Sequence, residues 1–362
     1  MPASETCSLG QSVAISDIGS ALKKLWQEGE EAMARASLIN LAVYSEKAGS
    51  LEKNTQLIAK ITESHACRAL VIGARPESKE NRVEAWVNAH CHVTRAGGKQ
   101  ICSEQISFSL EGPCVKWLPS IVFSHLDSDL PLYLWWQDDF PNEMDPQLWT
   151  WVDRLIFDSQ SWKDFAQQMR SLEMAEKDAK QRIVLCDLNW TRLDKVRYAI
   201  AQFFDHPASH HRFAKMESVT VNFAPGYKST AILLVGWLAA QLKWKTNQQQ
   251  MNGSCRFVDA NDRKIDIELQ EKAGSPIGAV ILNSAGVKFC VSPAKCGDLL
   301  EVCRAGEKEA GVAQMMPAQS NDPVDLMTQE LLRGGPHRIY LHAVTAVRGL
   351  LGRGGSPSRH GD

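Results

Sequence analysis

Residues 117–136, WLPSIVFSHLDSDLPLYLWW, contain the pattern that decides the fold class. Apolar residues from Leu118 to Leu126 recur at helical spacing, and the polar turn at residues 127–129 ends that pattern. Residues 130–136 are then almost wholly apolar. A strand without polar alternation is typically buried on both faces, as in a parallel sheet covered by helices. The stretch therefore predicts a short helix, a tight turn and a buried strand of an α/β fold.

The predicted strand ends in a pair of aromatic residues followed by acids. Trp135 and Trp136 are its last residues, and Gln137, Asp138 and Asp139 come directly after them. The carboxyl ends of strands are the usual binding edge of open α/β sheets. Alternation along the strand places one of the two rings in the core and the other towards that edge. We therefore expect a binding edge here.

The rest of the chain predicts two domains. Strands and helices alternate up to a polar break near residues 205–215, with one antiparallel hairpin at residues 82–110. We expect an N-terminal α/β domain at residues 17–208, built on a mixed, largely parallel sheet with flanking helices. A smaller α+β domain with antiparallel strands is expected at residues 215–351. Residues 1–16 and 352–362 carry little core pattern and predict a disordered N-terminus and a mobile tail.

Composition excludes several classes of partner. The 362 residues carry a net charge of −2 and a pI near 6.6, which gives no electrostatic case for nucleic acid or for an anionic membrane. The first residues lack the basic and apolar regions of a signal peptide, and the longest apolar run is too short to span a bilayer. Ten cysteines without a secretion signal indicate a reducing compartment and mostly free thiols. We expect a cytoplasmic protein.

Motifs for cofactor, metal and nucleophilic chemistry are weak. The sequence contains no GxGxxG, no GxxxxGK[ST] and no GxSxG. His90, Cys91, His92 and Cys102 form the most metal-like group, but alternation turns Cys91 away from the histidines, whereas structural zinc needs four convergent ligands. Cys186 lies beside an acid that would raise its pKa, so a buried structural thiol is the better interpretation. We expect no cofactor, no metal and no enzyme activity.

Two cysteines of the C-terminal part leave a redox alternative open. Cys290 and Cys296 flank the bend that Ser292 and Pro293 predict, and this bend could bring the two thiols together. A regulatory disulfide is one interpretation. The other is a pair of free thiols, because disulfides are uncommon in the cytosol.

Several pieces of the chain, in this order, resemble the OpcA family of glucose-6-phosphate dehydrogenase assembly proteins. They are 65–68 (HACR), 89–91 (AHC), 102–106 (CSEQI), 118–120 (LPS), 130–136, 153–159 (DRLIFDS), 187–193 (DLNWTRL) and 321–326 (NDPVDL). The resemblance covers roughly residues 30–345 and is clearer in the N-terminal half. It implies a non-catalytic assembly factor or allosteric activator of glucose-6-phosphate dehydrogenase in the oxidative pentose phosphate pathway, acting by protein–protein contact.

The candidate partner-binding residues combine large rings with charged neighbours at predicted strand ends. They are Trp135, Trp136, Asp153, Arg154, Asp158, Asn189, Trp190 and Arg192. The charged members could instead cap helices and pair with one another. A second hypothesis is a sugar-phosphate-binding protein or enzyme in which the same edge offers rings to a sugar and Arg192 to its phosphate. The missing glycine loop and catalytic pair count against this hypothesis.

Overall fold

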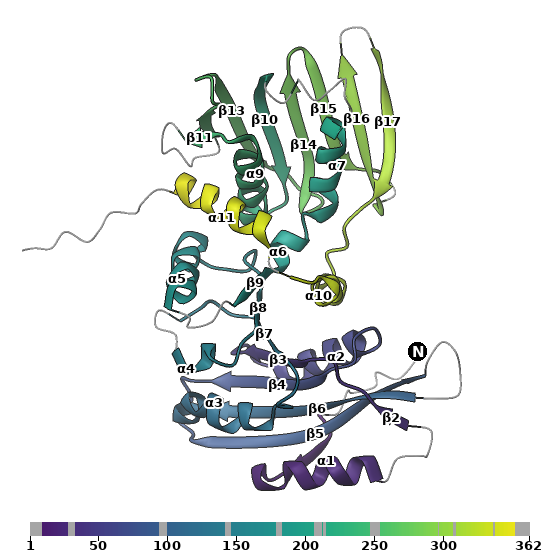
Figure 1. The fold of residues 1–362 in the computed structure, drawn as a ribbon, viewed down its shortest axis with the longest axis vertical. Coiled ribbons are helices and arrows are strands. Elements are labelled where there is room, and N and C mark those ends of the chain that lie inside the picture. The colour runs from purple at the N-terminus through teal and green to yellow at the C-terminus, as the bar shows by residue number, and fades with distance from the viewer. Residues whose placement is uncertain are drawn as a thin grey trace, which may run out of the picture. The chain divides into compact units, whose positions relative to one another are not determined.

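The computed structural model describes residues 9–27, 33–93, 100–141, 146–178, 183–205, 212, 215–246, 254–295, 297–306, 309–335 and 337–351. They form two compact units that interleave along the chain (Figure 1). Unit 1 comprises residues 1–158, 170–186 and 323–336, and unit 2 comprises residues 159–169, 187–322 and 337–362. The predicted limits of independently folding domains, 17–208 and 215–351, stay a prediction. Within the described part of the chain, the helices are too short or too polar to cross a bilayer.

The first sheet has nine strands. They are β1 (Gln11–Val13), β2 (Met33–Arg35), β3 (Asn40–Ser45), β4 (Arg68–Arg75), β5 (Arg82–Val93), β6 (Gln100–Glu111), β7 (Leu132–Trp136), β8 (Arg154–Phe157) and β9 (Val184–Asp187). The spatial order is β1-β5-β6-β4-β3-β7-β8-β9, and β2 pairs with β6. The pairs β4–β6, β3–β4, β3–β7 and β7–β8 are parallel, whereas β5–β6 is the predicted antiparallel hairpin. The largely parallel sheet is confirmed, and β1 places residues 11–13 in it rather than in a disordered terminus.

The spatial order of six strands, β6-β4-β3-β7-β8-β9, indicates where a ligand would lie in a sheet of this type. Numbered along the chain, they run 3-2-1-4-5-6, which is the order of a doubly wound dinucleotide-binding sheet. The order reverses between β3 and β7. The chain adds β4 and β6 on one side of β3, and then adds β7, β8 and β9 on the other side. In such sheets the ligand lies at this switch point, outside the carboxyl ends of the strands.

Helices cover both faces of this sheet. Glu104 of β6 accepts a hydrogen bond from Trp26 Nε1 of α1 (Ile18–Gln27), 3.2 Å away. The next residue, Gln105, donates to Thr55 Oγ1 of α2 (Ser50–Thr62), 2.9 Å away. Neighbouring residues of a strand point to opposite faces, so α1 and α2 lie on opposite sides. Helix α10 (Pro323–Leu332) contacts α2 within the same unit.

The predicted helix at residues 118–126 is broken into short pieces. These are the 3₁₀ helices η2 (Gly112–Trp117) and η3 (Phe123–His125) around α3 (Leu118–Ile121). Two prolines, Pro113 and Pro119, lie in the first turns of η2 and α3, where their missing N–H groups prevent a continuous helix. The apolar spacing is nevertheless used, because Leu118, Val122 and Phe123 are buried. The short helix α4 (Pro146–Trp149) follows β7.

The second sheet lies in unit 2 and has eight strands. They are β10 (Met216–Phe223), β11 (Lys245–Thr246), β12 (Ser254–Val258), β13 (Lys264–Glu271), β14 (Ile277–Ser284), β15 (Val287–Pro293), β16 (Leu299–Gly306) and β17 (Glu309–Pro317), in the order β11-β12-β13-β10-β14-β15-β16-β17. The predicted antiparallel pairing holds except for β10–β13, which is parallel. The reason is that α9 (Lys228–Leu242) crosses over after β10.

The remaining helices are α5 (Phe165–Asp178), α6 (Leu188–Thr191), α7 (Asp194–Asp205) and α11 (Arg338–Leu351). Helix α9 contacts β10 and β13, and α11 packs on α9. The approach of α9 and α11 requires Gly236, where a Cβ atom would lie 2.4 Å from Val347 Cγ2. The smaller α+β half of the fold prediction is thus confirmed.

Candidate functional site

Six residues of the protein itself meet at the switch point of the first sheet. These are Tyr44, Glu46, Asn54, Trp136, Gln137 and Asp138, which we call the switch-point cluster. Tyr44 is near the end of β3, Trp136 is the last residue of β7, and Asn54 lies in the second turn of α2. The Tyr44 and Trp136 rings stack with centroids 4.0 Å apart. Both residues are buried, so the stacked rings join the ends of β3 and β7.

Polar bonds tie the loops after β3 and β7 together. Asn54 and Gln137 form a reciprocal amide pair, with N···O distances of 3.1 and 2.9 Å. The Gln137 N–H donates to the Tyr44 carbonyl at 3.1 Å, and Lys47 Nζ donates to the Gln137 carbonyl at 3.0 Å. The side-chain amides at this edge are therefore bonded to each other.

The electrostatics of this cluster disfavour an anion. The Glu46 N–H donates to a carboxylate oxygen of Asp138 at 2.7 Å, and Tyr44 OH donates to a carboxylate oxygen of Glu46 at 2.7 Å. Burial, together with the Glu46 carboxylate, raises the pKa of Tyr44. A phosphate-binding loop instead points backbone N–H groups at its ligand. Here a carboxylate occupies the place of that ligand at the Glu46 amide.

The candidate partner-binding residues of unit 1 do not lie together at one edge of the sheet. Trp135 and Trp136 are 5% and 7% exposed, so neither ring is presented to solvent. Asp153 and Arg154 lie at the beginning of β8, beside Tyr133, whereas Asp158 follows its carboxyl end. Asp153 Oδ2 accepts the Leu132 N–H at 2.8 Å and so joins the beginnings of β7 and β8. These acids therefore lie at opposite ends of the strands.

Arg154 and Cys186 are neighbours in unit 1. Arg154 is buried, with its guanidinium 5.2 Å from the Tyr133 ring centroid and Nη1 3.8 Å from Cys186 Sγ. Burial, with a contribution from Glu330, raises the pKa of the Cys186 thiol to about 12. Cys186 is thus buried, as predicted, and its structural role stays a prediction.

In unit 2, the Asp187 carboxylate is the centre of a buried hydrogen-bond network. Oδ1 accepts the N–H groups of Ser159 and Asn189 at 3.0 and 2.9 Å. Oδ2 accepts the hydroxyls of Ser159 and Tyr340 at 2.7 and 3.2 Å. Asp187 is thus the N-cap of α6 and joins segments that lie 28 and 153 residues away. A satisfied network of this kind holds a unique arrangement of segments.

Asn189 and Arg192 extend this network. The Asn189 side-chain oxygen accepts hydrogen bonds from Thr230 Oγ1 at 2.6 Å and from Arg192 Nη1 at 3.1 Å. Arg192 Nε also donates to the side chain of Asn321, which donates to Tyr227 OH at 2.8 Å. Two pieces that carry the family resemblance, residues 187–193 and 321–326, therefore contact each other directly.

Trp190 is the third predicted tryptophan, and it is 2% exposed. The Arg197 guanidinium lies over its ring at 3.4 Å from the centroid, and the Tyr340 ring is 5.6 Å away. Cation–π and ring contacts of this kind stabilise the packing of the helices that carry them. The structure thus places Trp190, Asn189 and Arg192 in one buried group, and their role as partner-binding residues stays a prediction.

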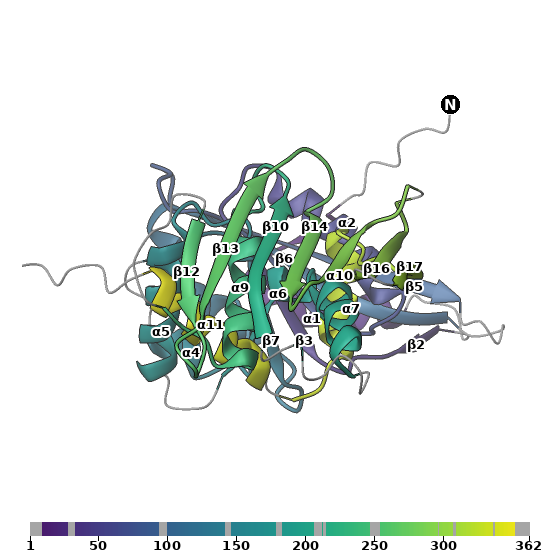
Figure 2. The same ribbon diagram turned by 90° about the horizontal axis from the view of Figure 1, so that it is seen from above.

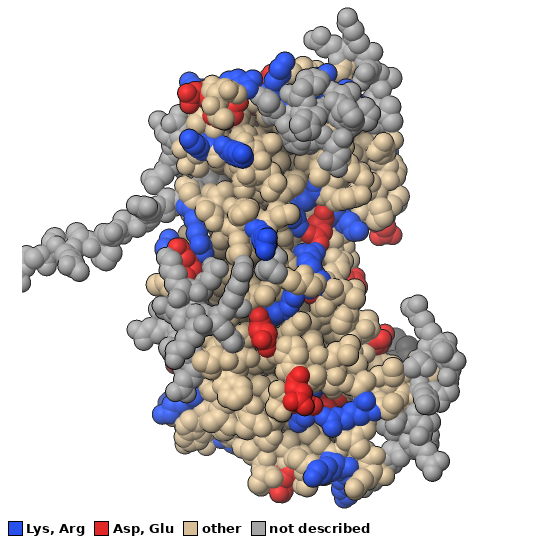
Figure 3. Space-filling model, viewed as in Figure 1, with Lys and Arg blue, Asp and Glu red and all other residues tan. Residues whose placement is uncertain are grey.

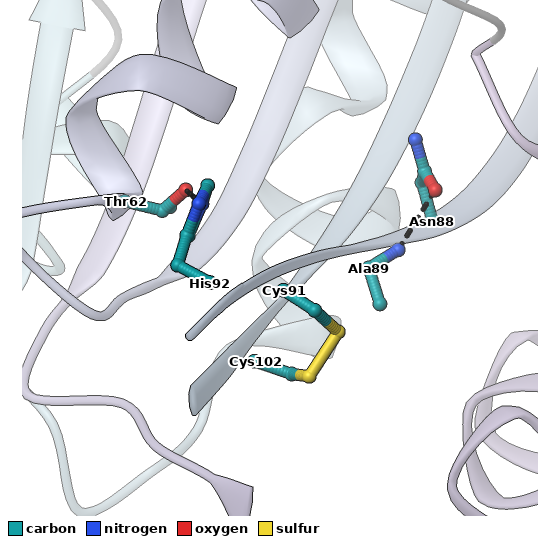
Figure 4. The surroundings of a disulfide bond; sticks show 6 residues. All are labelled: Thr62, Asn88, Ala89, Cys91, His92 and Cys102. Carbon is teal, nitrogen blue, oxygen red and sulfur yellow. Dashed lines mark hydrogen bonds between the residues drawn. A yellow bond between two sulfur atoms is a disulfide. The ribbon is translucent and has the colours of Figure 1, made fainter. Parts of the chain in front are cut away.

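The metal-like group in the first hairpin is used for other bonds. Cys91 and Cys102 are directly opposite in β5 and β6 and form a disulfide (Figure 4). His92 points to the other side of the strand, where its Nε2 lies 3.2 Å from Thr62 Oγ1. His90 Nε2 lies 2.9 Å from Gln105 Oε1. The expectation of mostly free thiols is thus wrong for Cys91 and Cys102, because strand pairing brings their sulfur atoms together.

The predicted redox pair is placed only in part, because Cys296 lies outside the described residues. Cys290 of β15 is instead directly opposite Cys303 of β16. Both are free and partly exposed, and burial raises the pKa of each thiol. Redox switching through Cys290 and Cys296 stays a prediction.

Two exposed tryptophans escaped the sequence reasoning. Trp117 and Trp151 are 44% and 50% exposed, and the Trp151 ring contacts buried Phe123 with centroids 6.4 Å apart. The segments around them, residues 117–124 and 146–152, contain no charged residue. Charges of both signs are interspersed on the face seen in Figure 3. The absence of charge in both segments was the available signal, because it is unusual for surface helices.

Comparison with known proteins identifies relatives of both halves. Residues 58–174 match the family model described as glucose-6-phosphate dehydrogenase subunit N-terminal domain, and residues 183–344 match its C-terminal counterpart. The OpcA protein of Nostoc punctiforme, whose name places it in the OxPP cycle, is 23% identical over 81% of this chain and 67% of its own length. Its Synechocystis counterpart is 24% identical over 80% and 65%. This chain thus spans about two thirds of these relatives.

Among solved structures, an aldose–aldose oxidoreductase from Caulobacter crescentus aligns with 86% of this chain and 94% of its own. The TM-score is 0.46 and the identity 7%, which is too low to support an argument about function.

Proposed function

Because this chain belongs to the OpcA family of glucose-6-phosphate dehydrogenase subunits, we propose that it is a non-catalytic assembly factor and allosteric activator of that dehydrogenase. It acts by protein–protein contact in the cytoplasm, in the oxidative pentose phosphate pathway. Its partner is the dehydrogenase, with neither nucleic acid nor a membrane involved.

The observation that carries this proposal is the switch-point cluster. The strand order is that of a dinucleotide-binding sheet, yet the stacked pair Tyr44–Trp136 and the amide pair Asn54–Gln137 occupy the edge where such a ligand would lie. The Asp138 carboxylate faces the loop amide that a pyrophosphate would need. Among the described residues, a dinucleotide-binding strand order is thus combined with an edge at which the protein's own side chains bond to one another, which supports a non-catalytic role.

An activator must bind the active state of its target more tightly than the inactive state. A tenfold shift in the equilibrium needs a difference of only about 1.4 kcal/mol in binding free energy. Trp117 and Trp151 are suited to supply it, because partly exposed tryptophans are frequent hot spots of protein interfaces.

The test is an initial-rate assay of NADPH formation with separately purified dehydrogenase, titrated with this protein. We expect no NADPH formation by this protein alone and a rise in the rate of the dehydrogenase that saturates with added protein. Turnover of glucose 6-phosphate by this protein alone, or an unchanged rate across the titration, would overturn the proposal.

Two tryptophan variants test whether Trp117 and Trp151 contact the dehydrogenase. Trp117→Ala combined with Trp151→Ala should raise the concentration needed for half-maximal activation at least about tenfold, as expected for loss of hot-spot rings. Tyr198→Ala is the matched control, because Tyr198 is 58% exposed on α7 and carries a ring of similar size. Equal effects of the double variant and the control would remove Trp117 and Trp151 from the interface.

The second hypothesis, a sugar-phosphate-binding protein or enzyme, gains no support from the described residues. Trp135 and Trp136 are buried, and Arg192 is bonded to the amide side chains of Asn189 and Asn321. A thermal shift with glucose 6-phosphate, in the absence of dehydrogenase, separates the two hypotheses. We expect no stabilisation by the sugar phosphate alone.

A further inference from the structure

Strand β17 ends the second sheet and forms its long edge. In Figure 1 and in Figure 2 it lies at the margin of the sheet, where it pairs with β16. It has nine residues, whereas β11, at the opposite end of the same sheet, has two, and one of them is Lys245. Short length and lysine protect an edge strand against pairing with another chain. Within the described part of unit 2, β17 is therefore the edge to which a further strand could add.

The sequence of β17 leaves this edge without protecting charges. Residues 310–317, AGVAQMMP, contain no charged residue. Ala313, Gln314 and Met315 are exposed, and the exposed fraction of Met315 is 57%. An exposed, uncharged edge of this length is a template for pairing with another strand.

A hydrogen bond beside β17 shows which of its backbone groups are turned away from β16. The Ala318 N–H donates to the Asp298 carbonyl at 2.9 Å, and these two residues continue the register of the β16–β17 pair. Bonded pairs alternate along an antiparallel ladder, so Gln314 also bonds to β16. The N–H and C=O groups of Ala313 and Met315 therefore point to the open side of the edge, where an added strand would bond to them.

A second β17 fits this edge across a two-fold axis through Gln314. Antiparallel pairing then places Ala313 opposite Met315 of the second copy, and such a pair exchanges two N–H···O=C bonds. The axis repeats the pair, so the outward groups of Ala313 and Met315 in both copies are bonded. The contact is isologous, so it closes at two copies and does not continue into a fibre.

The side chains along this edge select the same strand as the occupant. On the axis, Gln314 faces Gln314 of the second copy as a non-bonded pair, in which side chains approach most closely. Two amide side chains can each donate to and accept from the other, as Asn54 and Gln137 do in this chain. Ala313, a small residue, faces the larger Met315. Because an uncharged edge meets an uncharged edge, neither copy has to bury a charge.

We propose that this protein forms a homodimer in which two β17 strands pair antiparallel about Gln314 and join two eight-stranded sheets into one. The contact is smaller than an obligate interface, because the edge strands make it, so the dimer is reversible and depends on protein concentration. Self-association goes beyond the proposed action on the dehydrogenase and does not depend on it.

The first test is sedimentation velocity of the full chain over an about hundredfold range of protein concentration. The wild type should change from monomer to dimer as the concentration rises. Ala313→Pro should stay monomeric, because it removes an N–H group that β16 does not use and that the second copy needs. The far-UV spectrum and the melting temperature of Ala313→Pro show that the variant is folded.

Charges at position 314 test the register. Gln314→Lys and Gln314→Glu should each raise the dimer dissociation constant at least about tenfold, because like charges then face each other across the axis. An equimolar mixture of the two variants should dimerise again, because the mixed pair has opposite charges. Gln241→Lys and Gln241→Glu are the matched controls, because Gln241 is exposed on α9, and both should sediment as the wild type does.

A monomeric wild type, a folded Ala313→Pro that still dimerises, or a mixture of the Gln314 variants without recovery would each overturn the homodimer. Equal dissociation constants of the wild type and Gln314→Lys would mean that the two copies do not meet at β17. Dehydrogenase activation is measured on the same samples, so the two proposals fail independently. If the wild type is monomeric and Ala313→Pro abolishes activation, the β17 edge binds the dehydrogenase and the homodimer is wrong.

Discussion

The nine-stranded sheet is covered by α1 on the face of Glu104 and by α2 on the face of Gln105, whereas the eight-stranded sheet bears helices on the face of Val219 and Phe289. At the switch point of the first sheet, the protein's own side chains stack on and bond to one another. The second sheet leaves alternate residues of its central strands, such as Thr220 and Ile281, partly exposed on the other face. We therefore expect the protein contacts of this chain on strand faces and surface helices rather than at the strand ends of the first sheet.

The largest loss of stability is expected in the second unit, when the Asp187 carboxylate is removed. Asp187→Ala should lower the free energy of unfolding by about 3–5 kcal/mol, because the N–H groups of Ser159 and Asn189 and the hydroxyl of Tyr340 lose a buried acceptor. Urea denaturation followed by tryptophan fluorescence measures the loss. Asp298→Ala, at an exposed position of the same unit, should stay within about 0.5 kcal/mol of wild type. Equal stabilities would mean that the network is dispensable.

The sealed edge of the first sheet is broken by Trp136→Ala. We expect a loss of about 3 kcal/mol, because the stacked Tyr44 ring loses its partner and a cavity opens at the end of β7. Trp136→Phe should recover much of that loss, because a ring remains in the space. The same variants test the predicted partner role of Trp136. Normal dehydrogenase activation by folded Trp136→Ala and Trp190→Ala would remove both from the functional surface.

The disulfide strengthens the first sheet and has no counterpart placed among the described residues of the second. Reduction of Cys91–Cys102, or Cys91→Ser, should cost about 2–3 kcal/mol, because a loop with a sequence separation of 11 is no longer closed in the unfolded chain. The melting temperature with and without dithiothreitol measures this effect. Dithiothreitol should leave the melting temperature of Cys91→Ser unchanged. It should lower the melting temperature of Cys255→Ser, a variant at a free cysteine, as much as that of the wild type.

Acid should weaken the first unit by a smaller amount. Burial lowers the pKa of His90 below its ordinary value of 6.5, with a further lowering by His92 and an opposing effect of the Gln105 bond. Burial also lowers the pKa of His65 and His125. The unfolded chain then binds more protons than the folded chain, so stability is full above pH 6.5 and falls as the pH drops below it. Denaturation at pH 7.5 and 5.5 measures how much the free energy of unfolding falls with pH. We expect a smaller fall for His90→Gln.

Much of the fold could be predicted from local patterns. The apolar run before Trp135 predicted a covered strand, and the alternation in residues 82–93 predicted the hairpin. The switch-point cluster could not be predicted in the same way, because Asn54 and Gln137 are 83 residues apart and their pairing depends on strand order. The exposure of Trp117 and the burial of Trp190 were missed for a related reason. Periodicity shows that a residue is apolar, but tertiary packing decides whether it is covered.

The central claim is that this protein works by binding another enzyme. Sedimentation velocity of fluorescently labelled glucose-6-phosphate dehydrogenase, with increasing amounts of unlabelled wild-type protein and without nucleotide, tests it most directly. The account predicts a faster-sedimenting complex that forms at the concentrations at which the rate of NADPH formation rises. Unchanged sedimentation of the dehydrogenase across the range in which its rate responds would contradict the account.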